Sequence, residues 1–169
     1  YKWLIGIVIL VLVVVAFWRL HVFQLITNGG RDTAEAQNTV PVDGASLVSL
    51  GESTTLSLTF NGVERTYILH VPTGYDSSKQ YPLMLSYHGE GGSGAGQEQK
   101  TGFDKVADEN SFLVAYPSAV KGDWQITGSG SDIEFTEALI SAIENAYSID
   151  SSRIYISGFS AGGGMAQAI

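Results

Sequence analysis

The sequence of 169 residues contains no cysteine and only three histidines, and both scarcities exclude kinds of chemistry. Without cysteine there can be no disulfide, no thiolate metal ligand and no cysteine nucleophile. The histidines, His21, His70 and His88, do not share the spacing of metal ligands, which argues against a zinc enzyme. The sequence therefore gives no reason to expect a metal centre.

Basic residues are also few, nine against 17 acidic ones, and they are unevenly placed. Residues 1–27 carry Lys2 and Arg19 and no acidic residue, so the net charge of −8 becomes −10 over the remaining residues. The phosphates of a nucleic acid would repel an acidic body that has no basic run. We therefore expect no nucleic-acid partner.

Residues 3–18 form a run of 16 residues without a charged side chain or any hydrogen-bonding side chain except indole. As a helix this run extends about 24 Å, and Lys2 and Arg19 can snorkel at its ends, so it can cross a bilayer. A cleaved signal peptide is the main alternative, but the A-x-A sequence at 34–36 lies far downstream. A buried core helix is disfavoured because the run is apolar on every side. The pattern favours a transmembrane signal anchor in residues 1–27.

The anchor predicts a membrane-bound protein whose body lies on the extracytoplasmic side, or a secreted protein if the segment is removed. Residues 28–46 are polar and contain Gly, Asn, Asp and Pro without periodicity, which predicts a tether. A globular domain is expected over residues 47–169.

This domain begins with a predicted hairpin. Two alternating stretches, 55–60 and 63–71, flank Asn61-Gly62, a strong signal of a two-residue turn. Three short apolar runs then predict buried parallel strands, at 82–87, 112–116 and 153–157.

Helical patterns separate these runs. One predicts a short helix from Phe103 that ends near Asn110. The other spans 131–147, with a capping box from Ser131 to Glu134 and an apolar stripe that includes Ala146. The order of elements predicts an α/β fold with a mostly parallel sheet and an antiparallel N-terminal hairpin.

The motif G-x-S-x-G occurs once, from Gly158 to Gly162 with Ser160 at its centre. It directly follows a β-branched strand and leads into the start of a helix near Gly163, the setting of a nucleophile elbow. Gly158 and Gly162 are expected there because the serine backbone is strained and neighbouring chain passes close. The alternative is a serine in an ordinary glycine-rich turn.

A second glycine-rich loop, 88–92, directly follows the strand at 82–87. Such a loop can direct a backbone N–H at an oxyanion, together with the N–H of Ala161. Both loops leave the carboxyl edge of the parallel strands, where ligands bind. Because His88 precedes this loop, we expect it to orient the loop by hydrogen bonding and not to deprotonate Ser160.

Three other residues are weaker candidates for a functional role. Trp124 and Asp132 are candidates for lining a pocket, although helix capping explains Asp132 equally well. His70 lies in the hairpin, where we expect a cross-strand or edge role.

Several short motifs follow one another in an order that a known group of enzymes shares. They are Asn61-Gly-Val-Glu-Arg-Thr-Tyr67, Val71-Pro-Thr-Gly-Tyr75, Tyr81-Pro-Leu83, His88-Gly89, Tyr116-Pro117, Trp124, Ser131-Asp-Ile-Glu-Phe135 and the run from Ile149 to Gly163. Over about residues 54–169 this order resembles secreted α/β-hydrolase esterases of the polyhydroxybutyrate-depolymerase-like and feruloyl-esterase-like group.

The resemblance implies Ser160 as the nucleophile, with oxyanion donors at the backbone N–H groups of Ala161 and Glu90. It implies supporting roles for His88, Gly89, Gly158, Gly162, Trp124 and Asp132. The implied substrate is an ester of a hydroxyacid, a hydroxycinnamate or an acetylated sugar, polymeric substrates included, and no cofactor is implied.

Two departures from the group concern the site. The group commonly has Asp-Asp-Val-Gly-Phe at residues 131–135, of which Asp132 is the only acidic residue that carries over. Glu90 places a carboxylate in a loop that is expected to stabilise an anion. We expect its side chain to point away from the site.

The acid and the base of α/β-hydrolases follow the serine, yet none of the nine residues after Ser160 is Asp, Glu or His. A serine hydroxyl without a base is a poor nucleophile. We therefore expect this chain to be the N-terminal part of a longer serine ester hydrolase, cut after the elbow and inactive by itself. A serine peptidase on the same fold and a non-catalytic, membrane-tethered binding domain are the alternatives.

Overall fold

The computed structural model describes residues 49–128 and 131–169. The anchor expected in residues 1–27, which includes His21, and the tether expected in residues 28–46 lie outside the described residues. Within the described ranges, no helix has the length and apolar character needed to cross a membrane.

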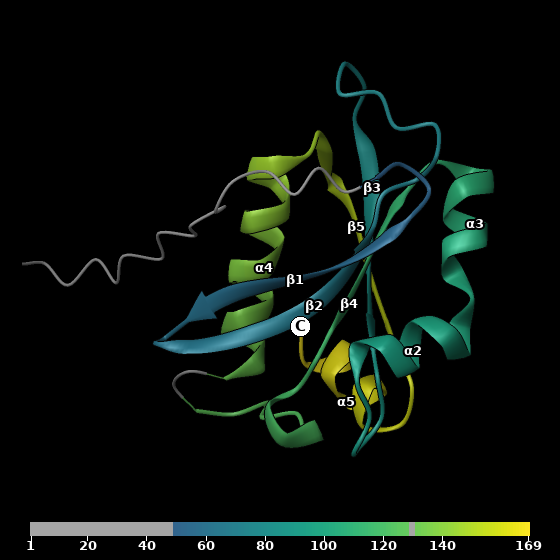
Figure 1. The fold of residues 1–169 in the computed structure, drawn as a ribbon. Helices are drawn as coiled ribbons and strands as arrows, with labels where there is room; N and C mark the ends of the chain where they lie inside the picture. The colour runs from purple at the N-terminus through teal and green to yellow at the C-terminus, as the bar shows by residue number, and fades with distance from the viewer. Residues whose placement is uncertain (1–48, 129–130) are drawn as a thin grey trace, which may run out of the picture. The chain divides into compact units, whose positions relative to one another are not determined.

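A mixed sheet of five strands, in the order β1-β2-β4-β3-β5, organises the described residues (Figure 1). The strands are β1 (Ser53–Phe60), β2 (Val63–His70), β3 (Tyr81–Tyr87), β4 (Leu113–Pro117) and β5 (Ile149–Gly158). β3 pairs in parallel with β4 and with β5, whereas β2 is antiparallel to both β1 and β4. The expectation of a mostly parallel sheet therefore holds for β4, β3 and β5, and the hairpin adds an antiparallel half.

The hairpin turn has the predicted geometry. Asn61 and Gly62 both adopt positive φ, 49° and 75°, which matches the right-handed twist of the flanking strands. The register opposes Phe60 to Val63 at the turn and Ser53 to His70 at the far end. The predicted hairpin is confirmed.

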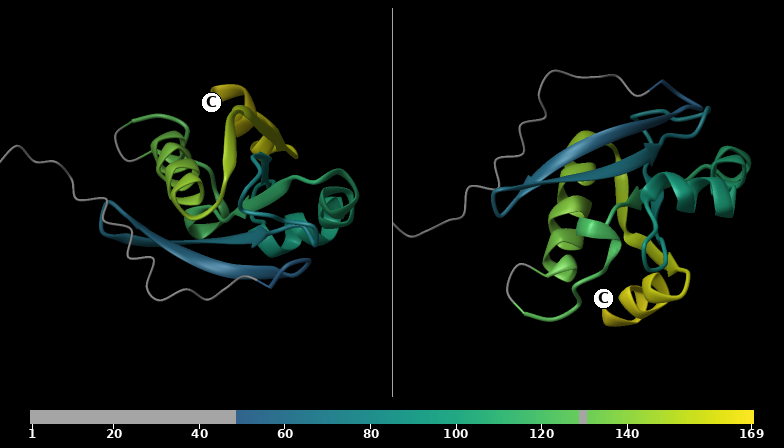
Figure 2. Two further views of the ribbon diagram at one scale, coloured as in Figure 1. Left: turned by 90° about the horizontal axis from the view of Figure 1, so that it is seen from above. Right: turned by 60° about the horizontal axis from the view of Figure 1, so that its bottom comes forward.

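Helices cover both faces of the sheet (Figures 1 and 2). They are α2 (Gly94–Thr101), α3 (Phe103–Asn110), α4 (Asp132–Ala146) and α5 (Ala161–Ala168), with a short 3-10 turn η1 (Val120–Gly122). Figure 1 shows α4 on one side of the sheet and α3 on the other. The result is an α/β/α arrangement.

The core follows the alternation of side chains along the strands. In β2, Tyr67 and Leu69 face the larger apolar cluster with α4 and α5, whereas Ile68 packs with Ala107 of α3 on the opposite face. Burial of each large apolar side chain contributes about 1.5–3 kcal/mol. The fully buried apolar side chains include Leu69, Leu83, Leu85, Leu113, Phe135, Leu139, Ile143 and Met165.

The sequence analysis misses α2. Its glycines, Gly94 and Gly96, are poor helix formers, so the segment has the composition of a loop. In the structure, Ser93 caps the helix by accepting a hydrogen bond from the Gly96 N–H. Gly94 is required by close packing, because a Cβ there would collide with the backbone carbonyl of Tyr116.

The burial of one helix residue and the starts of two elements differ from the expectation. Helix α4 has the predicted N-cap, since Ser131 Oγ accepts from the Glu134 N–H at 3.4 Å, but Ala146 at its last turn is exposed. Strand β5 begins at Ile149, four residues earlier than predicted. Helix α5 begins at Ala161, directly after the serine and not near Gly163.

A buried histidine joins the hairpin to α3. His70 lies opposite Ser53, with 3.3 Å between Nδ1 and the serine Oγ, and its Nε2 is 3.2 Å from Asp108 Oδ1. The cross-strand role expected of His70 is therefore confirmed. Asp108 Oδ1 also accepts from the backbone N–H of Thr73 at 2.8 Å, and this bond is the main reason why the pKa of Asp108 is lowered.

Replacing Asp108 with Asn is expected to lower the free energy of unfolding at pH 7 by about 1 kcal/mol, because the hydrogen bonds to the carboxylate lose their charge. A carboxyl whose pKa is lowered by folding stabilises the fold above its unfolded pKa, and this contribution is lost as the pH falls through the folded pKa. The stability difference between the variant and the unmodified protein should thus be smaller at a pH below about 3.9, the ordinary pKa of an aspartate, than at pH 7. Urea unfolding at both pH values measures this.

The matched control is Glu109→Gln, which removes a carboxylate from the exposed side of the same helix, where Lys105 lies 4.0 Å away. This control should change stability by less than about 0.5 kcal/mol at either pH. An equal loss for Asp108→Asn at both pH values would contradict the role of its charge.

Candidate active site

Ser160 stands between the end of β5 and the start of α5, at φ 53° and ψ −117°. This conformation is sparsely populated by residues other than glycine and is costly, so its surroundings must impose it. Hydrogen bonds close the turn, from the Gly162 N–H to the Phe159 carbonyl at 2.9 Å and from the Gly163 N–H to the Ser160 carbonyl at 2.8 Å. The strained strand–turn–helix expected around Ser160 is present.

Both glycines of the motif are needed for close packing. A Cβ at Gly158 would collide with the backbone of Gly162. A Cβ at Gly162 would collide with the backbone carbonyls of Tyr87 and His88, which begin the loop after β3. The motif thus packs directly against the second glycine-rich loop, at the carboxyl edge of the strands where the sequence analysis expects both loops.

We call residues His88–Gly92 the oxyanion loop. The Gly91 N–H ties it to the segment after β4 by donating to the Gly122 carbonyl at 2.9 Å, and the Gly92 N–H closes the loop on itself by donating to the Gly89 carbonyl at 3.0 Å. A Cβ at Gly89 would lie 3.3 Å from the Phe159 carbonyl oxygen, so the loop lies beside the serine turn. Glu90 is exposed.

Two backbone N–H groups, those of Ala161 and Glu90, are the candidate oxyanion donors. Ala161 is the first residue of α5, and the first N–H groups of an α-helix have no acceptor within the helix. The same helix end favours negative charge. Across from it, the hydrogen bonds that hold the oxyanion loop within the described residues use the N–H groups of Gly91 and Gly92 and leave that of Glu90.

His88 is buried, and both of its ring nitrogens contact a backbone hydrogen-bonding group. Its Nε2 accepts from the Ala119 N–H at 3.1 Å, and its Nδ1 lies 2.6 Å from the Gly89 carbonyl oxygen. A ring nitrogen that accepts an N–H carries no proton, so the proton is on Nδ1 and the imidazole is neutral. His88 thus contacts the oxyanion loop with one ring nitrogen and the segment after β4 with the other.

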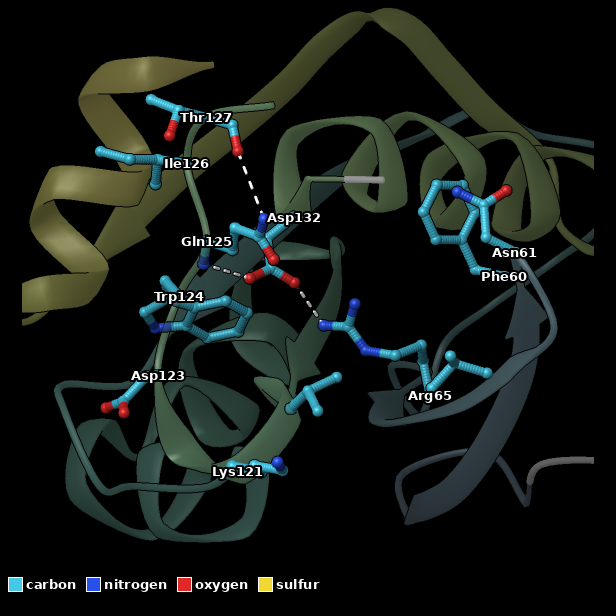
Figure 3. A pocket seen from close by; sticks show the side chains of 12 residues that line it. Phe60, Asn61, Arg65, Lys121, Asp123, Trp124, Gln125, Ile126, Thr127 and Asp132 are labelled. Atoms are coloured by element: carbon cyan, nitrogen blue, oxygen red, sulfur yellow. Dashed lines mark hydrogen bonds and ion pairs between the residues drawn. The ribbon is translucent and has the colours of Figure 1, made fainter. Parts of the chain in front are cut away.

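Trp124 and Asp132 line a pocket of about 710 Å³ beside the end of the hairpin (Figure 3). The Trp124 Nε1–H donates to the His88 carbonyl at 2.8 Å, and the two rings lie 4.6 Å apart. Asp132 is buried and accepts from the Gln125 N–H at 2.6 Å. Both residues line a pocket, and Asp132 also lies in the first turn of α4.

Tyr87 links the end of β3 to the start of α4. Burial raises the pKa of its hydroxyl, which stays protonated and lies 2.7 Å from Thr136 Oγ1. The Thr136 hydroxyl also lies 2.8 Å from the backbone carbonyl of Asp132, to which it donates. These bonds fix the residue that directly precedes the oxyanion loop.

Sequence reasoning misses Arg65, which contacts Asp132 at 2.5 Å and lines the same pocket. A signal for it was present, since Arg65 shares the inward side of β2 with Tyr67 and Leu69. A charged residue at an inward position requires a buried partner.

Sequence reasoning also misses the exposure of Phe159 and its contact with Lys100. This side chain is 55% exposed beside Ser160, and the Lys100 ammonium lies 4.1 Å from the centre of its ring. No pattern in the sequence links the two residues, because the contact joins α2 to the serine turn. Among residues 49–128 and 131–169, no three histidine or acidic side chains are placed to hold a metal ion.

Several known esterases are similar to this chain in sequence. "Probable feruloyl esterase C" of Aspergillus terreus is 40% identical over 119 residues, which are 64% of this chain and 43% of that protein. "Feruloyl esterase C" of Emericella nidulans is 32% identical over 136 residues, 76% of this chain and 50% of that protein. The chain thus spans about half the length of these relatives. No protein-family model matches it.

Among solved structures, an acetyl xylan esterase from Aspergillus awamori matches with a TM-score of 0.56 at 19% identity, over 64% of this chain and 43% of that one. Such a likeness shows a shared fold, which is of the α/β-hydrolase type. Over the residues that these comparisons cover, the chain is therefore related to the feruloyl-esterase-like group of α/β-hydrolase esterases.

Proposed function

We propose that the natural gene product is a serine ester hydrolase with Ser160 as its acyl-accepting nucleophile. The observation that carries this proposal is the positive φ of Ser160, 53°, in a turn that packs against the oxyanion loop. A hydroxyl so placed stands at the carboxyl edge of β3 and β5, next to the first N–H groups of α5. An ordinary glycine-rich turn does not need both a serine at positive φ and close packing against a second loop.

The reaction follows from these positions. Ser160 Oγ attacks the ester carbonyl and gives its proton to a base, while the N–H groups of Ala161 and Glu90 hold the tetrahedral oxyanion. The base then protonates the leaving alcohol, and an acyl-enzyme remains. A water molecule, deprotonated by the same base, releases the acid and restores the serine. This chemistry needs no cofactor.

The base in this proposal lies outside the described residues. His88 uses both ring nitrogens, toward Gly89 and Ala119. His70 lies between Ser53 and Asp108 on the face of the sheet that α3 covers. Neither is hydrogen-bonded to Ser160 in the described part of the chain.

The names of the relatives support hydroxycinnamoyl or acetyl esters as substrates. We also propose that residues 3–18 anchor the protein, with its catalytic domain on the extracytoplasmic side. The length and apolar character of that run support an anchor.

Replacing Ser160 with Ala in the natural gene product is expected to lower kcat/KM for methyl ferulate and for p-nitrophenyl acetate by about 10⁴-fold or more. It should also abolish covalent labelling by a fluorophosphonate probe, because the attacking oxygen is removed. Mass spectrometry of the labelled peptide locates the modified residue.

The matched control is Ser157→Ala, a serine on β5 three residues earlier, which should keep both labelling and turnover. Labelling that persists in Ser160→Ala would contradict the assignment. If the unmodified protein also showed no turnover, the non-catalytic alternative would be favoured.

The 169-residue chain expressed alone is expected to react with the fluorophosphonate at least about 100-fold more slowly than the natural gene product, because Ser160 lacks its base. The measurement is the second-order labelling rate of each protein, with near-ultraviolet circular dichroism to show that the chain is folded. Equal rates would mean that the chain supplies its own base.

Deleting residues 3–18 is expected to move the protein from the membrane pellet to the supernatant after alkaline carbonate extraction, because about 16 apolar residues no longer contact lipid. Fractions are compared by immunoblot. A control variant with Asp43→Asn in the tether should stay in the pellet. Release of the unmodified protein by carbonate would contradict an anchor.

A further inference from the structure

We propose that Arg65 is a positioning residue for the oxyanion loop, acting through Asp132 and Trp124. The catalytic consequence rests on the proposed function, whereas the structural coupling rests on contacts alone. Arg65 lies on β2 and the oxyanion loop follows β3, and these strands are separated in the sheet by β4. A chain of three contacts joins them.

The first contact is a buried ion pair. The side chains of Arg65 and Asp132 are each 5% exposed, and the Arg65 Nη2 donates to Asp132 Oδ1 at 2.5 Å. The same nitrogen donates to the Ser118 carbonyl at 3.2 Å, and the guanidinium lies 3.9 Å from the centre of the Phe135 ring. Removing both charges from water is costly, so such a pair is a weak source of stability. The contacts of Arg65 with the Ser118 carbonyl and the Phe135 ring hold the guanidinium, which in turn fixes one orientation of the carboxylate.

The second contact holds the chain before α4. Asp132 Oδ2 accepts from the Gln125 N–H at 2.6 Å, and the Asp132 N–H donates to the Gln125 carbonyl at 2.7 Å. Figure 3 shows Arg65 and Gln125 meeting the two oxygens of one carboxylate. If Arg65 did not hold Oδ1, the carboxylate could turn, and Gln125 would be held by its backbone bond to the Asp132 N–H alone.

The third contact reaches the oxyanion loop from the residue next to Gln125. The Trp124 Nε1–H donates to the His88 carbonyl at 2.8 Å, and its ring packs edge-on against Tyr87 at 5.1 Å. That His88 carbonyl is one of the two that Gly162 approaches. A shift of Trp124 therefore changes the peptide that precedes Gly89, and with it the direction of the Glu90 N–H.

The test compares Arg65→Met and Arg65→Lys in the natural gene product. The control is Arg153→Met, since Arg153 also joins an aspartate, Asp150 at 2.6 Å, to a backbone carbonyl, that of Gln80 at 3.2 Å, but lies exposed. We expect Arg65→Met to lower kcat for methyl ferulate by about 10- to 100-fold with KM changed less than about 3-fold, because oxyanion donors act in the transition state. Arg65→Lys should recover part of kcat, because lysine keeps the charge but not the planar set of donors.

Trp124→Phe is a milder variant, since it removes the indole N–H and keeps an aromatic ring. We expect it to lower kcat in the same way, and the double variant Arg65→Met/Trp124→Phe to be no slower than the slower single variant. Residues that act through one path are not additive. Full additivity would overturn the path through Trp124.

A structural readout separates positioning from activity. In protein labelled with 5-fluorotryptophan, the ¹⁹F resonance of Trp124 is the one that Trp124→Phe removes. Arg65→Met should shift this resonance and leave those of Trp3 and Trp18 in place, and Arg153→Met should shift none. An unmoved Trp124 resonance in folded Arg65→Met would overturn the proposal.

Failure of the proposed function has a different signature. In that case the unmodified protein shows no turnover that depends on Ser160, although the Trp124 resonance still responds to Arg65. A kcat that stays unchanged in a folded Arg65→Met, in a protein whose turnover does depend on Ser160, would overturn the positioning role alone.

Discussion

Gly162 packs so closely on the carbonyls of Tyr87 and His88 that no side chain fits between them, and the geometry of the site depends on this contact. The Phe159 N–H donates to the same Tyr87 carbonyl at 3.0 Å, so β3 and the serine turn are locked together at one point. A serine at φ 53° costs about 1–3 kcal/mol and persists only where its neighbours leave no alternative. Here the neighbours are a backbone loop on one side and a helix start on the other. The strain of Ser160 and the position of the oxyanion loop are thus two results of one packing contact.

The ion pair of Arg65 and Asp132 plays a different part in the fold. Close packing fixes the oxyanion loop against the serine turn, and on the side of β4 the Gly122 carbonyl accepts from the Gly91 N–H and the Ala119 N–H donates to His88. There the structure uses buried polar contacts, which are directional and fail if one partner moves. Because such a pair is costly to desolvate, apolar residues of similar size would hold the fold as well. Its presence near the start of β2, next to the proposed site, is what an orienting role requires.

Features decided within a few residues could be predicted from the sequence. The turn at Asn61-Gly62, the cap at Ser131 and the serine turn at 158–162 each depend on local backbone preferences, and all three are present. Helix α2 could not be predicted, because Gly94 is explained only by its contact with the Tyr116 carbonyl. Arg65 was missed for a similar reason, since its partner Asp132 lies 67 residues further along the chain. Pairing of β2 with β4, which makes half of the sheet antiparallel, is likewise a choice between distant segments.

The state of His88 separates two tasks that are easily confused in a serine hydrolase. A histidine that accepts from the Ala119 N–H at Nε2 and contacts the Gly89 carbonyl at Nδ1 has no free nitrogen for a substrate proton. Its neutral ring can therefore hold the oxyanion loop without responding to the reaction. In the proposed enzyme, the described residues supply the nucleophile and the geometry for charge stabilisation, both set by backbone packing. Proton transfer requires a group with a free lone pair close to Ser160, and that group must come from outside the described residues. In the proposed enzyme, then, preorganisation of the oxyanion site and activation of the serine are carried by separate parts of the protein.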